Sequence, residues 1–572
     1  MLCVGLASYD LGFREFRFIQ PDFISWVGGL LRFVSFLLAL RMIIELVIPK
    51  KVRVRLFSLG IVIFASLLTY FVVPSLSDVD VIGTRQLLLM KLILSTGIVL
   101  LFVTEVSHFL QLIYERVFNP GYIFVGSFIF LIGSGTLLLK LPQSTVHKIS
   151  VIDALFTATS AVCVTGLTVI DTATEFTRLG HVVIMLLIQV GGLGMMTFAG
   201  LLAYAVSGHA SIRTQLAFKD MMNTNRLANV MHLIYKVILV TFFFEAIGAV
   251  CIYLSLDDHL FGSTADKIFF SCFHAISAFC NAGFSTYSNN LYEPAIRFNY
   301  LFQFLVAWLI ILGGLGFPAV FGIYRYIRIR CINGFRAITK NRVRLHIPRL
   351  SYLSTRLALA VSAIMISMGF IAFVLFEQES SLVDHPTVVG KLITSFFGSV
   401  TARTAGFNTI DMTKVTLPMV MIYLLLMYVG ASPGSTGGGI KTTTAGIAGL
   451  NCIAIFKGRD RIHFQKSEIS RQSVQRAFAI IALSLICIST SVFFVSMYDS
   501  GKGLISIAFE VFSAFSTTGF SLGITPHLTS FSKLILIITM FVGRVGIVTL
   551  LVTFVKQSKP LYYRYPKQDI MF

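Results

Sequence analysis

The apolar positions of this chain form long runs that short polar connections separate. A helix needs roughly 20 residues to cross the hydrocarbon core of a bilayer. Seven runs approach or exceed that length, at 23–48, 56–73, 87–113, 121–141, 233–256, 357–376 and 477–497. These runs predict membrane-spanning helices, with few charges inside them.

A shorter apolar segment follows each of the last four long runs. These segments, at 152–161, 266–278, 388–400 and 504–514, are too short to cross a bilayer and end in small residues and a glycine. Backbone that leaves a helix at membrane depth must be buried in protein or line a water-filled cavity, because lipid cannot satisfy its N–H and C=O groups. The pattern therefore predicts loops that dip into the membrane beside a pore.

The four loops recur at similar intervals and in the same context. Their glycines are Gly166, Gly283, Gly406 and Gly519, separated by 117, 123 and 113 residues. Each loop precedes a further apolar segment, at 179–206, 301–324, 417–456 and 534–555, and we expect breaks at Gly191-Gly192, Gly313-Gly314, Gly430 and Gly543. Internal repeats outrank local signals in assigning a fold. The sequence predicts an all-α polytopic membrane protein in which four helix, pore-loop, helix repeats surround one ion pore in a pseudo-fourfold arrangement.

This pattern divides the chain into five parts. Residues 1–118 form an extra N-terminal segment of three transmembrane helices. Residues 119–230, 231–345, 346–470 and 471–572 form pore repeats one to four, the third with a glycine-rich loop and the fourth with a cytoplasmic tail. The extra helices carry Arg32, Arg41, Glu45, Lys91 and Glu105. We favour ion-paired packing against the pore over a voltage sensor, which needs regularly spaced arginines on one helix.

Composition and charge agree with a membrane protein. Hydrophobic residues make up 56% and charged residues 13% of the chain, and the mean hydropathy is +0.84, whereas soluble domains average roughly 45–50% and 25%. The net charge of +20 lies mostly in connections between apolar runs, which argues against nucleic-acid binding. Basic connections at 49–55, 325–356 and 457–476 should be cytoplasmic, so the N-terminus is expected outside and the C-terminus inside.

The loops carry the residue types that a cation filter needs. Each short helix would point its C-terminal end, which carries roughly half a negative charge, at the centre of the membrane. Glycine visits φ > 0 without steric strain, so it lets consecutive carbonyls face an axis and replace the water around an ion. A glycine taken alone would be read as a helix C-cap. The predicted ion-binding residues are Val164, Thr165, Gly166, Asn281, Ala282, Gly283, Thr404, Ala405, Gly406, Thr517, Thr518 and Gly519.

Three sequence motifs resemble the pore-forming subunits of the Trk/Ktr/HKT superfamily of potassium transporters. They are DALFTATSAVCVTGL at 153–167, RTAGFN at 403–408 and SPGSTGGGIKT at 432–442, and the resemblance extends over about 119–557. It implies potassium as the transported ion, a homodimer in the bacterial inner membrane, and a cytoplasmic nucleotide-binding regulatory subunit of the TrkA/KtrA type. No cofactor is expected on this chain, which has no dinucleotide or Walker fingerprint. Membrane lipids are the other expected partners.

The third apolar segment after a loop is interrupted by a glycine-rich stretch at 430–444. Each half is too short to cross the membrane, and glycine permits both a blocking and an open conformation. A phosphate-binding loop is a poor alternative, because no lysine directly follows the last glycine. The family assigns the gate to this stretch, and the predicted gate residues are Gly430, Gly434, Ser435, Thr436, Gly437, Gly438, Gly439, Lys441 and Arg544.

Several buried charges have two interpretations. Arg544 either faces the cavity as a barrier to cations or pairs with a buried carboxylate; the family resemblance favours the barrier. Arg403 and Glu510 are expected behind the loops as scaffold groups that pair with each other. Glu245, Gln189 and Gln303 are expected to form hydrogen bonds between helices.

The predicted function is potassium uptake down its electrochemical gradient. A sodium-permeable or sodium-coupled transporter is the first alternative, and a sensor or scaffold without conduction is another. A membrane-embedded enzyme is disfavoured because the 11 histidines show no HExxH or equivalent set. The eight cysteines have no ligand spacing and read as small core residues.

Overall fold

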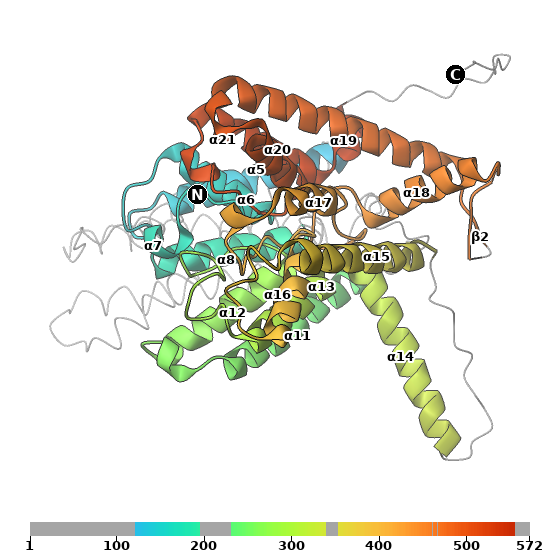
Figure 1. Cartoon of the computed structure of the whole chain (residues 1–572), viewed down its shortest axis with the longest axis horizontal. Helices are drawn as coiled ribbons and strands as arrows, with labels where there is room; N and C mark the ends of the chain where they lie inside the picture. The colour runs from blue at the N-terminus through green and yellow to red at the C-terminus, as the bar shows by residue number, and fades with distance from the viewer. Residues whose placement is uncertain (1–119, 195–229, 339–352, 460, 466, 555–572) are drawn as a thin grey trace, which may run out of the picture.

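The computed structural model describes residues 120–194, 230–338, 353–459, 461–465 and 467–554. Helices joined by loops make up these residues, apart from one hairpin of β1 (His463–Phe464) and β2 (Ser467–Glu468). The three predicted N-terminal helices at 23–48, 56–73 and 87–113, and the C-terminal tail, lie outside the described residues, which are drawn in colour in Figure 1.

The helices occur in four successive units of similar order. The long outer helices are α5 (Pro120–Leu139), α11 (Val230–Ser255), α15 (Leu353–Phe376) and α19 (Arg471–Tyr498). The short helices are α6 (Val151–Val162), α12 (Thr264–Cys280), α16 (Val388–Thr401) and α20 (Leu504–Ser516). The inner helices are α8 (Arg178–Leu193), α13 (Tyr300–Gly314), α17 (Leu417–Tyr428) and α21 (Ser530–Val545). The predicted starts of these helices agree with the structure to within six residues.

A further helix follows the inner helix in three units: α14 (Phe317–Ile338) in the second, α18 (Thr442–Phe456) in the third and α22 (Ile547–Phe554) in the fourth. In the first unit, the short helix α7 (Thr172–Glu175) lies between α6 and α8. Among the described residues, three helices are long and apolar enough to cross a membrane alone, and up to five if bent pairs count as one span. The bends are 103° between α13 and α14 and 90° between α21 and α22.

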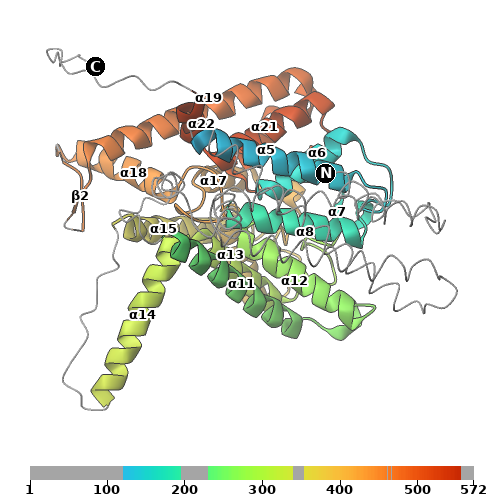
Figure 2. The ribbon, with the colours of Figure 1, turned by 180° about the vertical axis from the view of Figure 1, so that it is seen from behind.

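The units close around a common centre. In each unit, the inner helix packs on the short helix of the next unit: α8 on α12, α13 on α16, α17 on α20, and α21 back on α6. Figures 1 and 2 show the result, with the first and last units side by side although they are far apart in sequence. The short helices therefore lie inside, surrounded by outer and inner helices.

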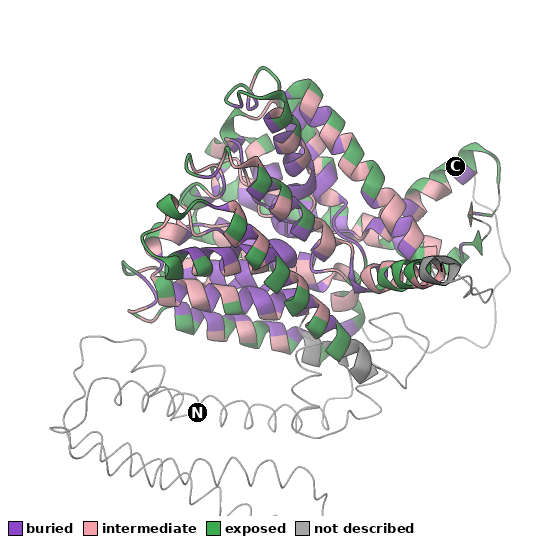
Figure 3. Ribbon diagram, turned by 90° about the horizontal axis from the view of Figure 1, so that it is seen from below, coloured by how far each residue is buried: buried purple, intermediate pink, exposed green. Residues whose placement is uncertain are grey.

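The outside of this assembly is apolar. Large side chains such as Phe242, Leu254, Ile364, Leu375 and Phe493 are exposed on the outer helices. Figure 3 shows exposed residues along the outer surface and buried ones toward the centre. The buried set includes many serines and threonines, for example Thr159, Ser277 and Thr394. An apolar exterior around a core that contains polar side chains is typical of a protein whose solvent is lipid.

A glycine with positive φ follows three inner helices. The predicted break at Gly313-Gly314 is confirmed, because α13 ends at Gly314 and the chain bends by 103° into α14. The breaks predicted at Gly191-Gly192 and Gly543 lie one and two residues before the ends of α8 and α21, at Leu193 and Val545. Positive φ occurs at Gly194, Gly316 and Gly546, where φ is 81°, 82° and 87°. Those values favour glycine over any L side chain.

The glycines at these helix ends also allow close packing. A Cβ atom added to Gly191, Gly313 or Gly543 would overlap the backbone carbonyl oxygen of Val162, Phe279 or Phe515, respectively. Each of these carbonyls lies at the end of a short helix, so the inner helix touches the short helix backbone directly. The predicted break at Gly430 in the third unit is confirmed, since α17 ends at Tyr428.

We predict that Gly313→Ala lowers the thermal stability of the purified protein. The added methyl meets the Phe279 carbonyl, which cannot move without moving α12, and such overpacking costs about 1–3 kcal/mol. Gly449→Ala in α18 is the matched control, because it has open space at its Cβ position and should be neutral or stabilising by up to ~1 kcal/mol. Equal melting temperatures for the two variants in detergent would contradict the packing described here.

Candidate ion pathway

The four loops that follow the short helices share an unusual backbone. In each, the residue two positions before the glycine has positive φ: Val164 (56°), Asn281 (61°), Thr404 (77°) and Thr517 (50°). The glycines also have positive φ: Gly166 (86°), Gly283 (70°), Gly406 (73°) and Gly519 (91°). Positive φ is uncommon outside glycine, so its recurrence at one position in four loops marks a common conformation.

The loops meet in a closed ring. A Cβ atom on Gly166 would overlap the carbonyl oxygen of Ala282, and one on Gly283 would overlap that of Ala405. The same relation joins Gly406 to Thr518, and Gly519 to Thr165, which returns to the first loop. A side chain at any of the four glycines would therefore displace the carbonyl of the neighbouring loop. We call the carbonyls of Thr165, Ala282, Ala405 and Thr518 the carbonyl ring.

The carbonyl ring is buried and has no donors. All four of its residues have 0% exposure, yet within the part of the chain that the structure describes none of the four carbonyls accepts a hydrogen bond. Buried backbone carbonyls are almost always paired. The adjoining hydroxyls Thr165 Oγ1 and Thr518 Oγ1 are also buried without a described partner. This concentration of unpaired oxygens, at the C-terminal ends of four helices, is suited to a dehydrated cation.

Polar side chains behind the ring fix the loops. Ser277 Oγ donates to the Phe284 carbonyl and Thr401 Oγ1 to the Phe407 carbonyl, both at 2.8 Å. Asn290 Nδ2 donates to the Gly283 carbonyl at 2.9 Å. These supports were absent from the sequence prediction. One signal was available, because serine stands six residues before the glycine in three loops, as Ser160, Ser277 and Ser513.

The segment between α17 and α18, residues 429–441, lies directly against the loops of three units. We call it the α17–α18 loop. Gly438 N donates to Thr517 Oγ1 at 2.9 Å, and Thr436 Oγ1 donates to the Phe279 carbonyl at 3.3 Å. A Cβ on Gly437 would overlap the Thr404 hydroxyl. The predicted gate segment is thus brought to the predicted filter, and its glycines are needed for that approach.

The α17–α18 loop is tied at both ends and to neighbouring helices. Gly430 N donates to the Ile440 carbonyl at 2.9 Å, and Lys441 Nζ donates to the Gly437 carbonyl at 2.7 Å. Gly434 O accepts from Phe317 N at 3.0 Å, and Ser435 Oγ donates to Ser432 O at 2.6 Å. Gly439 packs near Ser516. These contacts close the loop on itself beneath the carbonyl ring.

Arg544 reaches the loop from the fourth unit. Its guanidinium donates to the carbonyls of Thr436 and Gly191, so it joins the α17–α18 loop to α8. Among the described residues no carboxylate pairs with it, so the alternative of a buried ion pair has no support there. A cation fixed beside the loop is what the barrier interpretation requires.

The predicted pairing of Arg403 with Glu510 is wrong. Arg403 Nη2 donates to Ser362 Oγ at 3.1 Å and to the Gly430 carbonyl at 3.2 Å. Glu510 accepts from Ser521 Oγ, Thr525 Oγ1 and Leu522 N at 2.6, 2.7 and 3.2 Å. Each charged group is thus hydrogen-bonded within its own unit and not to the other.

The expected hydrogen bonds between helices are confirmed. Gln189 Nε2 on α8 donates to Glu245 on α11 at 2.9 Å. Thr394 Oγ1 on α16 donates to Gln303 on α13 at 3.2 Å. Both contacts cross from one unit to the next.

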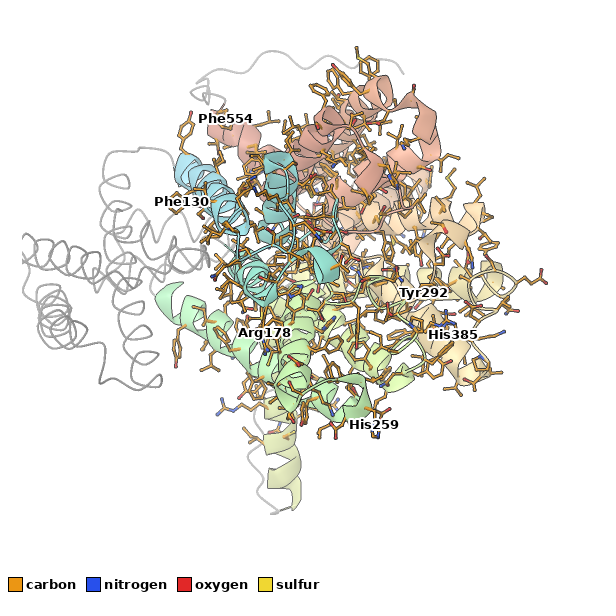
Figure 4. All side chains as sticks on the ribbon, turned by 90° about the vertical axis from the view of Figure 1, so that its left-hand side faces the viewer. Phe130, Arg178, His259, Tyr292, His385 and Phe554 are labelled. Atoms are coloured by element: carbon orange, nitrogen blue, oxygen red, sulfur yellow. The ribbon has the colours of Figure 1, made fainter. Side chains whose placement is uncertain are left out.

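Ion pairs join the units at the end of the molecule where the short helices begin. Arg178 lies 3.0 Å from Asp266, and Lys533 lies 2.7 Å from Asp153. A third pair, Arg297 with Asp384 at 3.6 Å, links the second and third units. Figure 4 looks onto this face, where Arg178, Tyr292 and His385 are labelled. In the first two pairs, the base belongs to the start of an inner helix and the acid to the start of a short helix in the next unit, whereas Arg297 and Asp384 lie in the connections that precede α13 and α16.

Side-chain ligands are not available for a conventional metal site. No group of three or more His, Cys, Asp or Glu residues in the described ranges could hold a metal ion. A cation in this region would have to be bound by backbone carbonyls and hydroxyls. Those ligands suit hard alkali cations rather than transition metals.

Comparison with known proteins gives consistent matches. The family model TrkH, described as a cation transport protein, matches residues 90–562. The chain is 35% identical over 460 residues to the potassium/sodium uptake protein NtpJ of Enterococcus hirae, covering 79% of this chain and 97% of that one. It is 33% identical to the Ktr system potassium uptake protein B of Bacillus subtilis, covering 79% and 96%.

A solved structure has the same fold. The potassium transporter TrkH of Vibrio parahaemolyticus aligns with a TM-score of 0.58 at 16% identity, over 94% of this chain and 98% of that one. Together with the family match over most of the chain, this excludes the alternative of a membrane-embedded enzyme. The chain belongs to the TrkH family of cation transport proteins.

Proposed function

We propose that this protein takes up potassium ions across a bacterial cell membrane through the carbonyl ring. The observation that carries the proposal is the set of four buried carbonyls, one from each unit, that accept no described hydrogen bond. The four units act as repeats around one pore, and the twelve residues predicted from the sequence form the filter. The names of the Ktr and NtpJ relatives support potassium as the ion.

Sodium is the second candidate, because one relative is named a potassium/sodium uptake protein. Four glycines favour potassium. In plant members of the superfamily, a serine in place of the first-repeat glycine accompanies sodium preference. Here all four positions are glycine, and each glycine permits the neighbouring carbonyl to keep its place in the ring.

The α17–α18 loop acts as the gate in this proposal. It lies against the loops of three units, and Arg544 adds a fixed positive charge beside it. The loop would have to leave this position for an ion to pass. The proposed membrane orientation places the N-terminus outside and the C-terminus in the cytoplasm, so that the short helices enter from the external side.

A separate cytoplasmic subunit controls the gate in this proposal. Two relatives are named as protein B of a Ktr system, which implies further components of those systems. Helix α14 projects from the rest of the described residues (Figure 1) and exposes Arg325, Arg328 and Arg330. This basic surface suits an acidic docking partner, which would be the subunit that binds the nucleotide. Anionic lipid is the competing occupant. In this proposal the chain itself forms a homodimer.

Replacing the first ring glycine tests the filter. We expect the unmodified protein to transport Rb⁺ and K⁺ in preference to Na⁺ when expressed in cells that lack other potassium uptake systems. Gly166→Ser should reduce that preference, because its side chain displaces the Ala282 carbonyl. Uptake with competing cations measures the ratio. Equal Na⁺ and K⁺ permeability in the unmodified protein would favour the second candidate.

Shortening the loop tests the gate. Removing residues 437–443 deletes the contacts with Thr404 and Thr517, so we expect faster Rb⁺ flux into proteoliposomes that contain no regulatory subunit. Size-exclusion chromatography confirms that the variant is folded. Unchanged flux through a folded deletion variant would show that the loop is not the barrier.

Charge reversal tests the docking surface. Changing Arg325, Arg328 and Arg330 to glutamate should abolish co-purification of a cytoplasmic partner from native membranes, because like charges would then face each other. Cross-linking of the same samples reports the homodimer. Partner binding that survives the reversal would place the interface elsewhere.

A further inference from the structure

The third unit departs from the other three where its inner helix meets its short helix. In units one, two and four, a helical glycine packs on the carbonyl four residues before the ring glycine, as Gly543 does on Phe515. The corresponding pair in the third unit is Gly430 and Ala402. The nearest atoms to a Cβ on Gly430 belong instead to Gly438 and Gly439, within the α17–α18 loop.

At the same junction, the third unit has an arginine where the other units have a small residue. The residue three positions before the ring glycine is Cys163, Cys280 or Ser516 in the other units, and Arg403 in the third. The backbone differs as well. Thr518 N bonds to the carbonyl of Ser513, five residues back, and loops one and two do the same, whereas Ala405 N bonds to Thr401, four residues back.

Arg403 forms hydrogen bonds to the α17–α18 loop and to α15 at this junction. Its Nη2 atom donates to the Gly430 carbonyl at 3.2 Å and to Ser362 Oγ on α15 at 3.1 Å. The N–H of Gly430 is bonded to the Ile440 carbonyl at 2.9 Å, so Gly430 is where the two ends of the α17–α18 loop meet. Arg403 therefore holds the base of the loop from the filter side and from the outer helix at once.

Displacing the loop would leave this guanidinium without one of its acceptors. Gly430 moves when the loop moves, whereas Ser362 stays on α15. Arg403 Nε is already buried without a described partner, and a buried cation that loses an acceptor is strongly disfavoured. The contact thus favours the conformation in which the loop lies beneath the carbonyl ring.

We propose that Arg403 is a positioning residue that latches the α17–α18 loop closed through the Gly430 carbonyl, with Ser362 as its anchor. This inference rests on the proposed gate function of that loop. The competing role is a scaffold for the third filter loop alone, since Arg403 is also three residues from Gly406. A latch controls how often the pore opens, whereas a filter scaffold controls which ion passes.

The test measures Rb⁺ and Na⁺ flux in proteoliposomes without a regulatory subunit. Arg403→Gln should raise Rb⁺ flux roughly tenfold, the factor expected from losing one charge-assisted hydrogen bond, and should leave the Rb⁺/Na⁺ ratio unchanged. Arg403→Lys keeps the charge and one donor position, so it should restore most of the closure. Ser362→Ala should give a smaller increase, and Arg471→Gln, at an exposed arginine on α19, should have no effect.

Combination with the loop deletion separates the two proposals. In the variant that lacks residues 437–443, Arg403→Gln should add nothing, because the closed loop is gone. If the deletion raises flux but Arg403→Gln does not, the latch is wrong and the gate stands; if the deletion has no effect, the gate itself is wrong. A changed Rb⁺/Na⁺ ratio with unchanged flux would assign Arg403 to the filter.

A second measurement keeps the latch testable if the Arg403 variants do not fold. Ser435→Cys in the α17–α18 loop reports exposure of the loop through its rate of modification by a water-soluble thiol reagent. In that background, Ser362→Ala should increase the rate several-fold, because the anchor of Arg403 is lost. An unchanged rate would overturn the latch.

Discussion

The structure depends on keeping four backbone carbonyls buried without hydrogen-bond donors. Leaving a buried polar group unpaired costs about 1–3 kcal/mol, so the loops of Thr165, Ala282, Ala405 and Thr518 would relax unless something held them. Each loop is held by its short helix, by side chains behind it such as Ser277, and by the preceding loop of the ring, whose glycine leaves room for its carbonyl. A bound cation would supply the missing partner. The rest of the assembly, including the packing of each inner helix on the following short helix, preserves this ring.

A ring of four similar units needs one dissimilar unit if it is to be gated. Helical glycines lock three inner helices onto the short helices, because Gly191, Gly313 and Gly543 touch backbone carbonyls. The third inner helix stops at Tyr428 and continues as a loop that side-chain hydrogen bonds hold in place. Hydrogen bonds can be exchanged at moderate cost, whereas close backbone packing cannot. The proposed function, a fixed filter with a movable barrier, would use this asymmetry.

Much of this arrangement was predictable from the sequence, for identifiable reasons. Segment length distinguished outer from short helices, and the interval between glycines located the four loops. Two helix ends lie one or two residues beyond the predicted glycines because glycine has two uses that look alike in a sequence: Gly543 allows close approach, and Gly546 allows positive φ. The Arg403–Glu510 pair was wrong because each charge has other partners, which no sequence pattern reveals: a carbonyl and a hydroxyl accept from Arg403, and hydroxyls and an N–H donate to Glu510. Asn290 was missed because its contact with the Gly283 carbonyl crosses an irregular loop.

The central claim is that the carbonyl ring binds a potassium-like cation in place of protein donors. Anomalous X-ray diffraction from crystals grown in Rb⁺ tests it directly, since Rb⁺ resembles K⁺ and scatters anomalously. We expect an anomalous peak on the axis of the ring, within coordinating distance of the carbonyls of Thr165, Ala282, Ala405 and Thr518, that is lost when Na⁺ replaces Rb⁺. A ring without Rb⁺ density, in crystals whose loops are well ordered, would contradict the account.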